Sequence, residues 1–126
     1  MKKFFLFILF FIITLFSFSE NFFGTFDAKL HQIKGDITVD NINGTIAIND
    51  FTYDGKGSDV YIIISKDKNF KDKKNISKKL KRAYVNEDVY LEVKNLDKLM
   101  DKGYNTISVY TQKYKYSFAD AKLIMD

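Results

Sequence analysis

The feature that most constrains the fold is the spacing of the apolar residues, which recur at every second position through most of the chain. Val89, Leu91 and Val93 alternate with more polar residues, and Ile37 and Val39 do the same. Successive side chains of a β-strand point to opposite faces, so this period indicates strands with one buried face. The apolar pattern predicts strands at residues 25–30, 36–40, 46–53, 60–64, 89–93, 106–112 and 114–124. It therefore favours an all-β fold.

Turn residues and changes of phase add detail to these strands. Asn43-Gly44 tolerates the positive φ of a two-residue hairpin turn, so we expect residues 37–39 to pair with residues 46–48. The apolar positions then change parity, and a β-bulge near Asn49 and Asp50 explains the slip. The run VYIII, which starts at Val60, is apolar on both parities. That pattern is typical of a central strand covered on both faces.

One segment has a helical period instead. In NLDKLMDKG, which starts at residue 95, Leu96, Leu99 and Met100 are spaced for one helix face. Asn95 stands where an N-cap is expected and Gly103 where a helix could stop, so we expect one or two helical turns. With seven or eight short strands and this helix, the sequence predicts a single-domain antiparallel β-sandwich. A small β-barrel is the alternative.

The beginning of the chain predicts its destination. Two lysines precede an apolar run over residues 4–16, and Ser17 and Ser19 supply small residues before a cleavage point. The run is shorter than the about 18 to 20 residues of a transmembrane span. We therefore interpret residues 1–19 as a signal peptide and residues 20–126 as the mature domain. An uncleaved anchor is the alternative. After cleavage near Ser19, we expect a secreted or periplasmic protein with no transmembrane span.

Composition argues against several classes of function. The chain has no cysteine, so neither a disulfide nor a lipid-modified cysteine is available. Cleavage would remove Lys2 and Lys3 and lower the formal net charge from +4 to +2. This charge is too small to suggest nucleic-acid binding. The chain has only one histidine, so a multi-histidine metal centre is excluded, and no set of residues resembles a catalytic site. We expect a protein that is not an enzyme and has no metal site and no cofactor.

The segment FTYDGKGSDV, which starts at residue 51, holds most of the candidate binding residues. Its glycines supply backbone angles that other residues resist, and its aspartates can accept backbone N–H groups, so a structural turn explains it. A polar rim that contacts a ligand is the second interpretation. A weak Ca²⁺ site is the third, although the lysine in the middle is unlike a dedicated calcium loop. The candidate ligand-binding residues here are Tyr53, Asp54, Gly55, Gly57 and Asp59.

Two further candidates lie elsewhere in the chain. His31 is the only histidine, and a structural histidine with satisfied hydrogen bonds is the first interpretation. The alternative is a binding residue whose imidazole offers one axial or hydrogen-bonding nitrogen. Tyr110 is the second candidate, because with Tyr114 and Tyr116 it could line a shallow ligand surface. Packing is the competing explanation for all three tyrosines.

A basic segment runs from Lys66 to Arg82 and holds nine Lys or Arg against two Asp. Runs of this kind are usually solvated loops. The functional alternative is contact with an anionic surface such as lipid head groups, to which each basic group contributes about 1 kcal/mol. Otherwise we expect the partner to be an envelope protein or a small ligand.

Three phrases, read in order, resemble the DM-thirteen domain, a family of exported and extracellular modules. FGTFDAKLHQIKG, from residue 23, is similar to the opening of that family, and NDFTYDGKGSDVYIII, from residue 49, to its central hallmark. ISVYTQKYKYSFADAKL, from residue 107, is similar to its last two strands. The resemblance covers nearly all of the mature chain. It implies a β-sandwich associated with extracytoplasmic redox or electron-transfer systems.

The resemblance also implies a cysteine after an aromatic residue in the penultimate strand. Thr111 stands at that position, after Tyr110, and Ser58 stands where many members have proline. Without a thiol, this chain can offer neither thiol redox chemistry nor a thiolate ligand. We therefore expect an exported, non-catalytic binding or accessory module of the cell envelope, with Thr111 among its candidate binding residues. The alternative is an extracytoplasmic redox accessory protein that holds or docks a cofactor.

Overall fold

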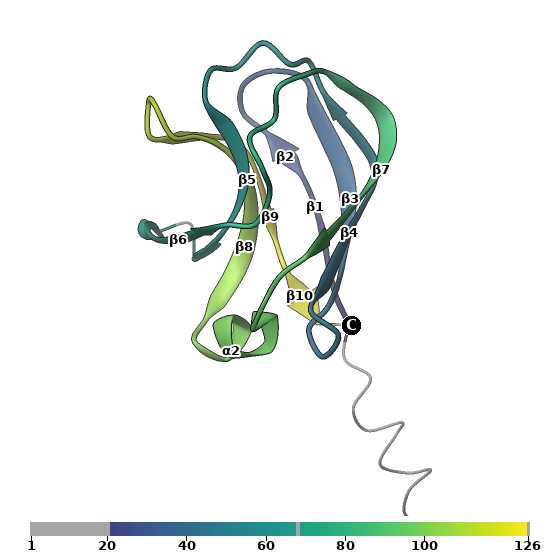
Figure 1. Cartoon of the computed structure of the whole chain (residues 1–126), viewed down its shortest axis with the longest axis vertical. Coiled ribbons are helices and arrows are strands. Elements are labelled where there is room, and N and C mark those ends of the chain that lie inside the picture. Colours follow the sequence, from purple (N-terminus) through teal and green to yellow (C-terminus); the bar gives the residue numbers. More distant parts are fainter. Residues whose placement is uncertain (1–20, 68, 126) are drawn as a thin grey trace, which may run out of the picture.

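Two five-stranded sheets form the described part of the chain, residues 21–67 and 69–125 of a computed structural model. One sheet has the strand order β10-β1-β3-β4-β7 and the other β2-β9-β8-β5-β6, and the sheets pack face to face (Figure 1). The antiparallel β-sandwich is confirmed, and these strands form no closed barrel. The elements are β1 (Asn21–Thr25), β2 (Asp27–Ala28), β3 (Ile33–Asp40), β4 (Thr45–Tyr53), β5 (Val60–Lys66), β6 (Asn69–Asn75), β7 (Tyr84–Glu92), α2 (Leu96–Asp101), β8 (Tyr104–Thr111), β9 (Tyr116–Lys122) and β10 (Ile124–Met125).

The described part of the chain has more strands than the expected seven or eight. One reason is that two segments, each predicted as a single strand, form two strands that belong to different sheets. β1 pairs with β3 and β10 in one sheet, the chain turns at the buried Phe26, and β2 pairs with β9 in the other. β9 and β10 divide in the same way at the buried Leu123. Both crossings lie on one long side of the sandwich. The predicted strand 25–30 is wrong after Ala28, because Leu30 lies in a bend and is 49% exposed.

The β3–β4 hairpin has the expected register but a different turn. Ile37 lies opposite Ile48, and Val39 lies opposite Ile46, which confirms the predicted pairing. The loop, however, spans the four residues between the paired Asp40 and Thr45, so the two-residue turn is wrong. Within it, only Gly44 has a positive φ, of 70°. The longer loop is stabilised by the Asp40 carboxylate, which accepts the backbone N–H of Asn43 at 3.1 Å and its side-chain amide at 2.7 Å.

The predicted bulge in β4 is confirmed. The register against β7 shifts between Ile48 and Phe51, and Asp50 within the shift has a φ of 55°. The extra residue restores the inward direction of the next apolar side chains. Phe51 and Tyr53 are consequently both 0% exposed.

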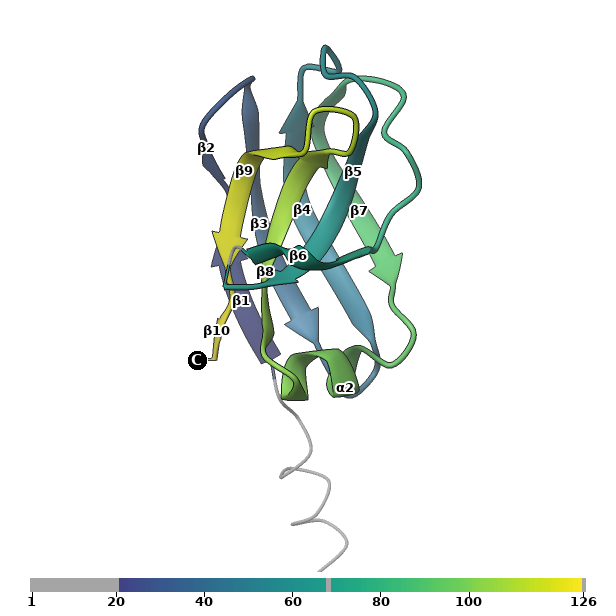
Figure 2. The same ribbon diagram turned by 90° about the vertical axis from the view of Figure 1, so that its left-hand side faces the viewer.

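The hairpin of β5 and β6 crosses the outer face of its own sheet (Figure 2). The Phe70 ring of β6 lies 5.2 Å from the ring of Tyr110 on β8, a strand that β6 does not pair with. Ile62 and Ile64 face the core, while Ile63 faces outward and is also 0% exposed. The expectation of a strand covered on both faces is confirmed. The solvated-loop interpretation of the basic segment is wrong for residues 69–75, which form β6.

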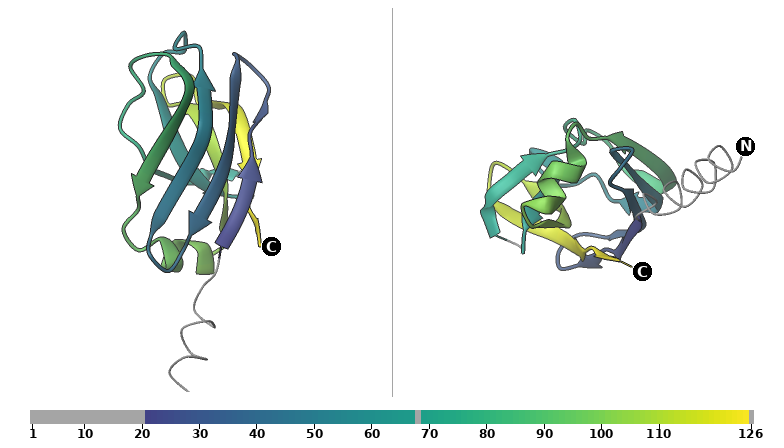
Figure 3. Two further views of the ribbon diagram at one scale, coloured as in Figure 1. Left: turned by 90° about the vertical axis from the view of Figure 1, so that its right-hand side faces the viewer. Right: turned by 90° about the horizontal axis from the view of Figure 1, so that it is seen from below.

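The short helix α2 lies across one end of the sandwich (Figure 3). Leu96 inserts into the core and is 1% exposed. The helix ends before Gly103, whose φ of 98° suits a glycine at a helix end. Asn95 occupies the predicted N-cap position, but it has a φ of 59° and its side chain makes no capping hydrogen bond.

Leu96→Ala should lower the free energy of unfolding by about 2–5 kcal/mol, because it leaves a cavity at the capped end of the core. Leu30→Ala is the matched control and should change the free energy of unfolding by less than about 0.5 kcal/mol, since Leu30 is 49% exposed. Urea unfolding followed by circular dichroism measures both. Equal effects of the two substitutions would contradict the placement of α2 over the core.

Candidate functional site

The candidate site lies at the end of the sandwich opposite α2, where the β2–β3 and β4–β5 loops meet (Figure 1). His31 comes from the first loop, and Asp54 and Gly57 come from the second. Tyr53 ends β4 directly before the second loop. The structure thus brings four of the eight sequence candidates together. His31 has a φ of 65°, a left-handed conformation in which His is enriched among non-glycine residues.

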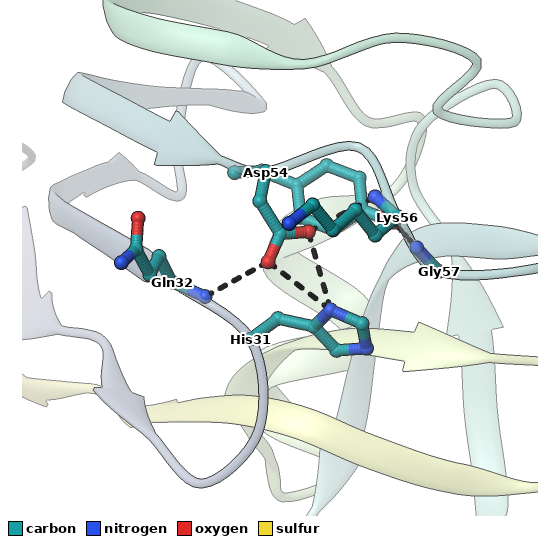
Figure 4. Close-up of polar contacts among 6 residues, drawn as sticks. His31, Gln32, Asp54, Lys56 and Gly57 are labelled. Carbon is teal, nitrogen blue, oxygen red and sulfur yellow. Dashed lines mark hydrogen bonds and ion pairs between the residues drawn. The ribbon is translucent and has the colours of Figure 1, made fainter.

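The carboxylate of Asp54 joins the two loops. Its oxygens lie 3.2 Å from Nδ1 of His31 and accept the backbone N–H of Gln32 at 3.2 Å and of Lys56 at 2.9 Å (Figure 4). Burial raises the pKa of Asp54, but the hydrogen bonds from Lys56, Gln32 and His31 outweigh it, so the pKa lies below its ordinary value. Asp54 is therefore an ionised acceptor at neutral pH.

This carboxylate also determines which nitrogen of His31 is available. An ionised carboxylate only accepts hydrogen bonds, so Nδ1 carries the proton and Nε2 of the neutral ring carries the lone pair. Figure 4 shows Nε2 on the side of the ring away from Asp54. The side chain of His31 is 24% exposed. The ring can thus offer one oriented acceptor or ligand nitrogen at the surface.

Aromatic rings support His31 from below. The centroid of its ring lies 4.3 Å from that of Phe118 and 6.4 Å from that of Tyr53. Phe118 is 1% exposed, and Tyr53 accepts the backbone N–H of Gly57 on its hydroxyl oxygen at 2.8 Å. Phe118 was not among the sequence candidates. It lies at a register shift between β8 and β9, so alternation could not show which way its side chain points.

A shallow cleft of ≈ 480 Å³ opens beside the His31 loop, and we call it the His31 cleft. Most of its polar lining comes from the ends of β3, β4 and β7. Thr52 and Asn86 are held together there, because Asn86 N–H donates to Oγ1 of Thr52 at 3.1 Å and that hydroxyl donates to Oδ1 of Asn86 at 3.3 Å. The lining residues are Ala28, His31, Gln32, Ile33, Lys34, Thr52, Val85 and Asn86.

The two loop glycines are required for different reasons. Gly55 has a φ of 74°, and a Cβ there would lie 2.7 Å from the backbone nitrogen of Ala83. The expected unusual backbone angle at Gly57 is wrong, because its φ is not positive. A Cβ at Gly57 would instead lie 2.5 Å from Phe118 and 2.6 Å from the Tyr53 hydroxyl. Gly57 is therefore a point of close approach.

The acidic residues around this loop do not converge. Asp54 contacts His31, whereas the Asp59 carboxylate lies 3.6 Å from Nζ of Lys79. The Asp50 backbone N–H donates to the side chain of Asp88. Within residues 21–67 and 69–125, no group of three or more His, Cys, Asp or Glu residues gathers as a set of metal ligands.

The remaining two candidates lie on opposite faces of β8. Thr111 is 0% exposed, faces the core beside Val60, and its hydroxyl donates to the carbonyl oxygen of Ser58 at 2.6 Å. It thus anchors the β4–β5 loop from beneath. Tyr110 points outward under Phe70, with Nζ of Lys73 5.6 Å from its ring centroid. Tyr110 is therefore separate from the His31 cluster.

A buried polar cluster, which was not predicted, anchors the His31 loop. Asp120 is 4% exposed and accepts hydrogen bonds from the hydroxyls of Ser108 and Ser117. Nζ of Lys29 lies 2.9 Å from its other oxygen. Burial raises the pKa of Asp120, but these partners outweigh it, so the pKa lies below its ordinary value. Because side chains alternate along β9, Asp120 lies on the face opposite Ala119. Only the fold shows that this face is covered.

Comparison with known proteins adds one finding. A family model with the description "Electron transfer DM13" matches residues 25–123. The matched range includes His31, both loops of the candidate site, and Thr111. Searches among curated proteins and solved structures found no match.

Gly55→Val and Gly57→Val should each lower the free energy of unfolding by about 1–3 kcal/mol or more, through backbone strain at the first and overpacking at the second. Gly103→Val is the control for strain alone, because its φ is 98° and a Cβ there would meet nothing within 4 Å. Thermal unfolding compares the three. If both loop variants melt like wild type, the structural-turn interpretation is wrong.

Asp54→Asn should destabilise the protein at neutral pH and have a smaller effect in acid. The folded pKa of Asp54 is lowered, so the carboxylate stabilises the fold above its ordinary value of 3.8 and loses this contribution as the pH falls below it. The difference in urea midpoint between wild type and variant should therefore narrow from neutral pH toward pH about 3. Asp101→Asn, which removes an exposed carboxylate at the other end, controls for net charge. A difference that does not change with pH would contradict the assigned hydrogen bonds.

Proposed function

The chain belongs to the Electron transfer DM13 family, and on that premise we propose that it is an exported, non-catalytic binding or accessory module of the cell envelope. The observation that carries this proposal is Thr111. The resemblance places the cysteine of the family at this position, and the chain has no cysteine at all. Thiol exchange and thiolate ligation both need a sulfur atom, so Thr111 cannot perform either.

Thr111 still has a structural role at that position. Its side chain is fully buried, and its hydroxyl donates to the Ser58 carbonyl at 2.6 Å. A buried hydroxyl needs such a partner, and this one links β8 to the β4–β5 loop. The scaffold around the candidate site is thus maintained without a redox-active side chain. This supports binding rather than thiol chemistry as the role of the module.

The His31 cleft is the surface that we propose for binding. Nε2 of the neutral His31 ring is available to accept a hydrogen bond, while Gln32, Lys34 and Asn86 line the same cleft with amide and ammonium groups. Such a set suits a small polar ligand or a polar side chain of an envelope protein. The His31 ring is held by Asp54 and Phe118 before any ligand arrives, which reduces the entropy lost on binding.

Export rests on the apolar run of residues 4–16 and the small residues after it, all of which lie outside the described residues. Within residues 21–67 and 69–125, no helix has the length and apolar character needed to cross a membrane.

A second candidate function is a redox accessory role in which the protein holds or docks a cofactor. Membership of an electron-transfer family and the outward Nε2 of His31 favour it. An imidazole nitrogen can serve as one axial ligand of a haem iron without any thiol. The two proposals differ in whether His31 accepts a hydrogen bond from a ligand or coordinates a metal.

Mass spectrometry and an absorption spectrum of the protein purified from its native envelope test both proposals together. We expect a chain that begins near Glu20 and shows no visible absorbance band. A Soret band that disappears in His31→Asn would overturn the first proposal in favour of the second. Asn is chosen because it tolerates the positive φ of position 31, so the variant removes the imidazole and keeps the loop. Recovery of an intact chain that begins at Met1 in the membrane fraction would contradict export.

A further inference from the structure

The two long sides of the sandwich are built differently. On one side the chain crosses between the sheets at Phe26 and Leu123 and closes the gap between them. On the other side β7 is the edge of its sheet, and the β5–β6 hairpin folds away over the outer face of the opposite sheet (Figure 2). The segment of residues 76–83 links β6 to β7 on this side, and the backbone N–H groups of Ile76 and Leu80 donate to the carbonyls of Ile62 and Val60 at 2.9 and 2.8 Å. A cleft remains between this segment and β7, and we call this side the open side.

The open side contains a cleft of ≈ 530 Å³ that lies over the core and is lined by both apolar and polar residues. Phe51 and Ile62, both 0% exposed, form part of its lining, and Leu80 contributes from the segment after β6. Val89 and Leu91 of β7 line the same cleft and are only half-buried. Their register partners on β4, Ile48 and Ile46, are 0% exposed. The difference shows that the edge strand lacks a cover that the neighbouring strand has.

A second cleft of ≈ 470 Å³ continues the first toward α2. Asn75, Ile76 and Glu92 line both clefts, so the two meet at these residues. The second cleft has an apolar part formed by Ile76, Val93 and Leu99 and a basic rim. We call the two clefts together the open-side groove. The lysines of its rim near α2 are Lys74, Lys94, Lys98 and Lys102.

The charge of the groove is strongly one-sided. Two further lysines, Lys78 and Lys79, line the first cleft, although Lys79 lies 3.6 Å from the carboxylate of Asp59. Among the described residues that line either cleft, Glu92 is the only carboxylate. Only some of these lysines belong to the basic segment. The structure adds Lys94, Lys98 and Lys102, so the basic end of the groove is made by residues far apart in the sequence.

We propose that the open-side groove binds a single-chain anionic amphiphile, of which a long-chain fatty acid is the simplest example. The acyl chain lies along the first cleft beside Leu80, Val89 and Leu91, and the carboxylate lies among the lysines near α2. Burial of methylene groups and charge complementarity then act at the two ends of one ligand. Each cleft has a volume within the range of small-ligand sites, about 300–1,000 Å³.

The shape of the groove favours this occupant over a simple anion or a membrane surface. A small anion would use the lysines and leave the first cleft over Phe51 and Ile62 empty. Attachment to a membrane needs apolar side chains that protrude, whereas Val89 and Leu91 are half-buried and pack against the core. This site is separate from the His31 cleft, so it does not depend on the proposed function of that cleft.

The charged end of the site is tested by fluorescence titration of the protein with cis-parinaric acid, followed by displacement with palmitate. The double variant Lys98→Glu, Lys102→Glu should bind about tenfold or more weakly than wild type, because it reverses two charges beside the carboxylate. The matched control is Lys113→Glu, Lys122→Glu, which makes the same change in net charge at exposed residues outside the groove. It should bind like wild type. Wild type and all variants are compared in the same processed form, so any contribution of the apolar residues 4–16 would be equal in each.

The apolar end is tested by filling the cleft. Val89→Trp places a larger side chain in the cleft, so it should abolish parinarate binding while circular dichroism and the melting temperature stay close to wild type. In wild type, affinity should rise with chain length from decanoate to palmitate, by up to about fourfold per added methylene that fits. Equal affinity for the two acids would overturn the proposal.

Three further outcomes would overturn it. The first is the absence of parinarate binding to wild type, and the second is equal binding by the two double-charge variants. The third is displacement of parinarate by inorganic phosphate as effectively as by palmitate, which would reduce the site to a general anion site. Binding to phosphatidylglycerol vesicles tests whether the lysines contact a membrane instead of a free fatty acid. If the protein cosediments with these vesicles but does not bind palmitate, the lysines serve membrane contact and the groove proposal is rejected.

Discussion

The pairing of β5 with β8 is the interaction on which the rest of the structure depends. The chain has no cysteine, so backbone ladders and packing alone hold the sandwich. Ile62, Ile64, Ile107 and Val109 from these two strands are all 0% exposed. At one end of the pair, the hydroxyl of Thr111 holds the β4–β5 loop through the Ser58 carbonyl. On the outer face, the pair supports the β5–β6 hairpin, and at its edge β5 accepts the backbone N–H groups of Ile76 and Leu80.

The candidate site depends on that ladder through a second layer of contacts. The backbone N–H groups of Lys29 and Leu30 donate to the carbonyl of Phe118 at 2.8 and 3.1 Å, and the Lys29 ammonium pairs with the buried Asp120. These contacts hold the loop that carries His31 against β9. Asp54 then fixes the ring from the other loop. The orientation of a single imidazole nitrogen is thus determined by buried polar and aromatic contacts rather than by the loop alone.

The two surfaces that we propose for binding differ in their physical basis. The His31 cleft presents a few polar groups held by hydrogen bonds, and its specificity would come from these oriented groups. The open-side groove combines apolar side chains with a basic end, and its affinity would come from burial and charge. Thr111 stands where the resemblance to the family implies a cysteine, so the chain lacks thiol chemistry at this position. Both surfaces are unaffected by this difference, because Thr111 is buried beneath the loop and lines neither of them.

The sequence by itself determined the all-β fold class, the register of β3 with β4, the bulge at Asp50 and the inward direction of Thr111. These features depend on the parity of side chains within one strand or one hairpin, which the order of residues states directly. The tertiary structure alone decided that two strands divide between sheets and that β6 covers Tyr110. It also decided that His31 meets Asp54, 23 residues away, and that Lys74 lines the same cleft as Lys98 of α2. Such contacts depend on how separate elements pack and on positive φ at residues such as His31 and Asn95, and no local pattern of apolar residues encodes either.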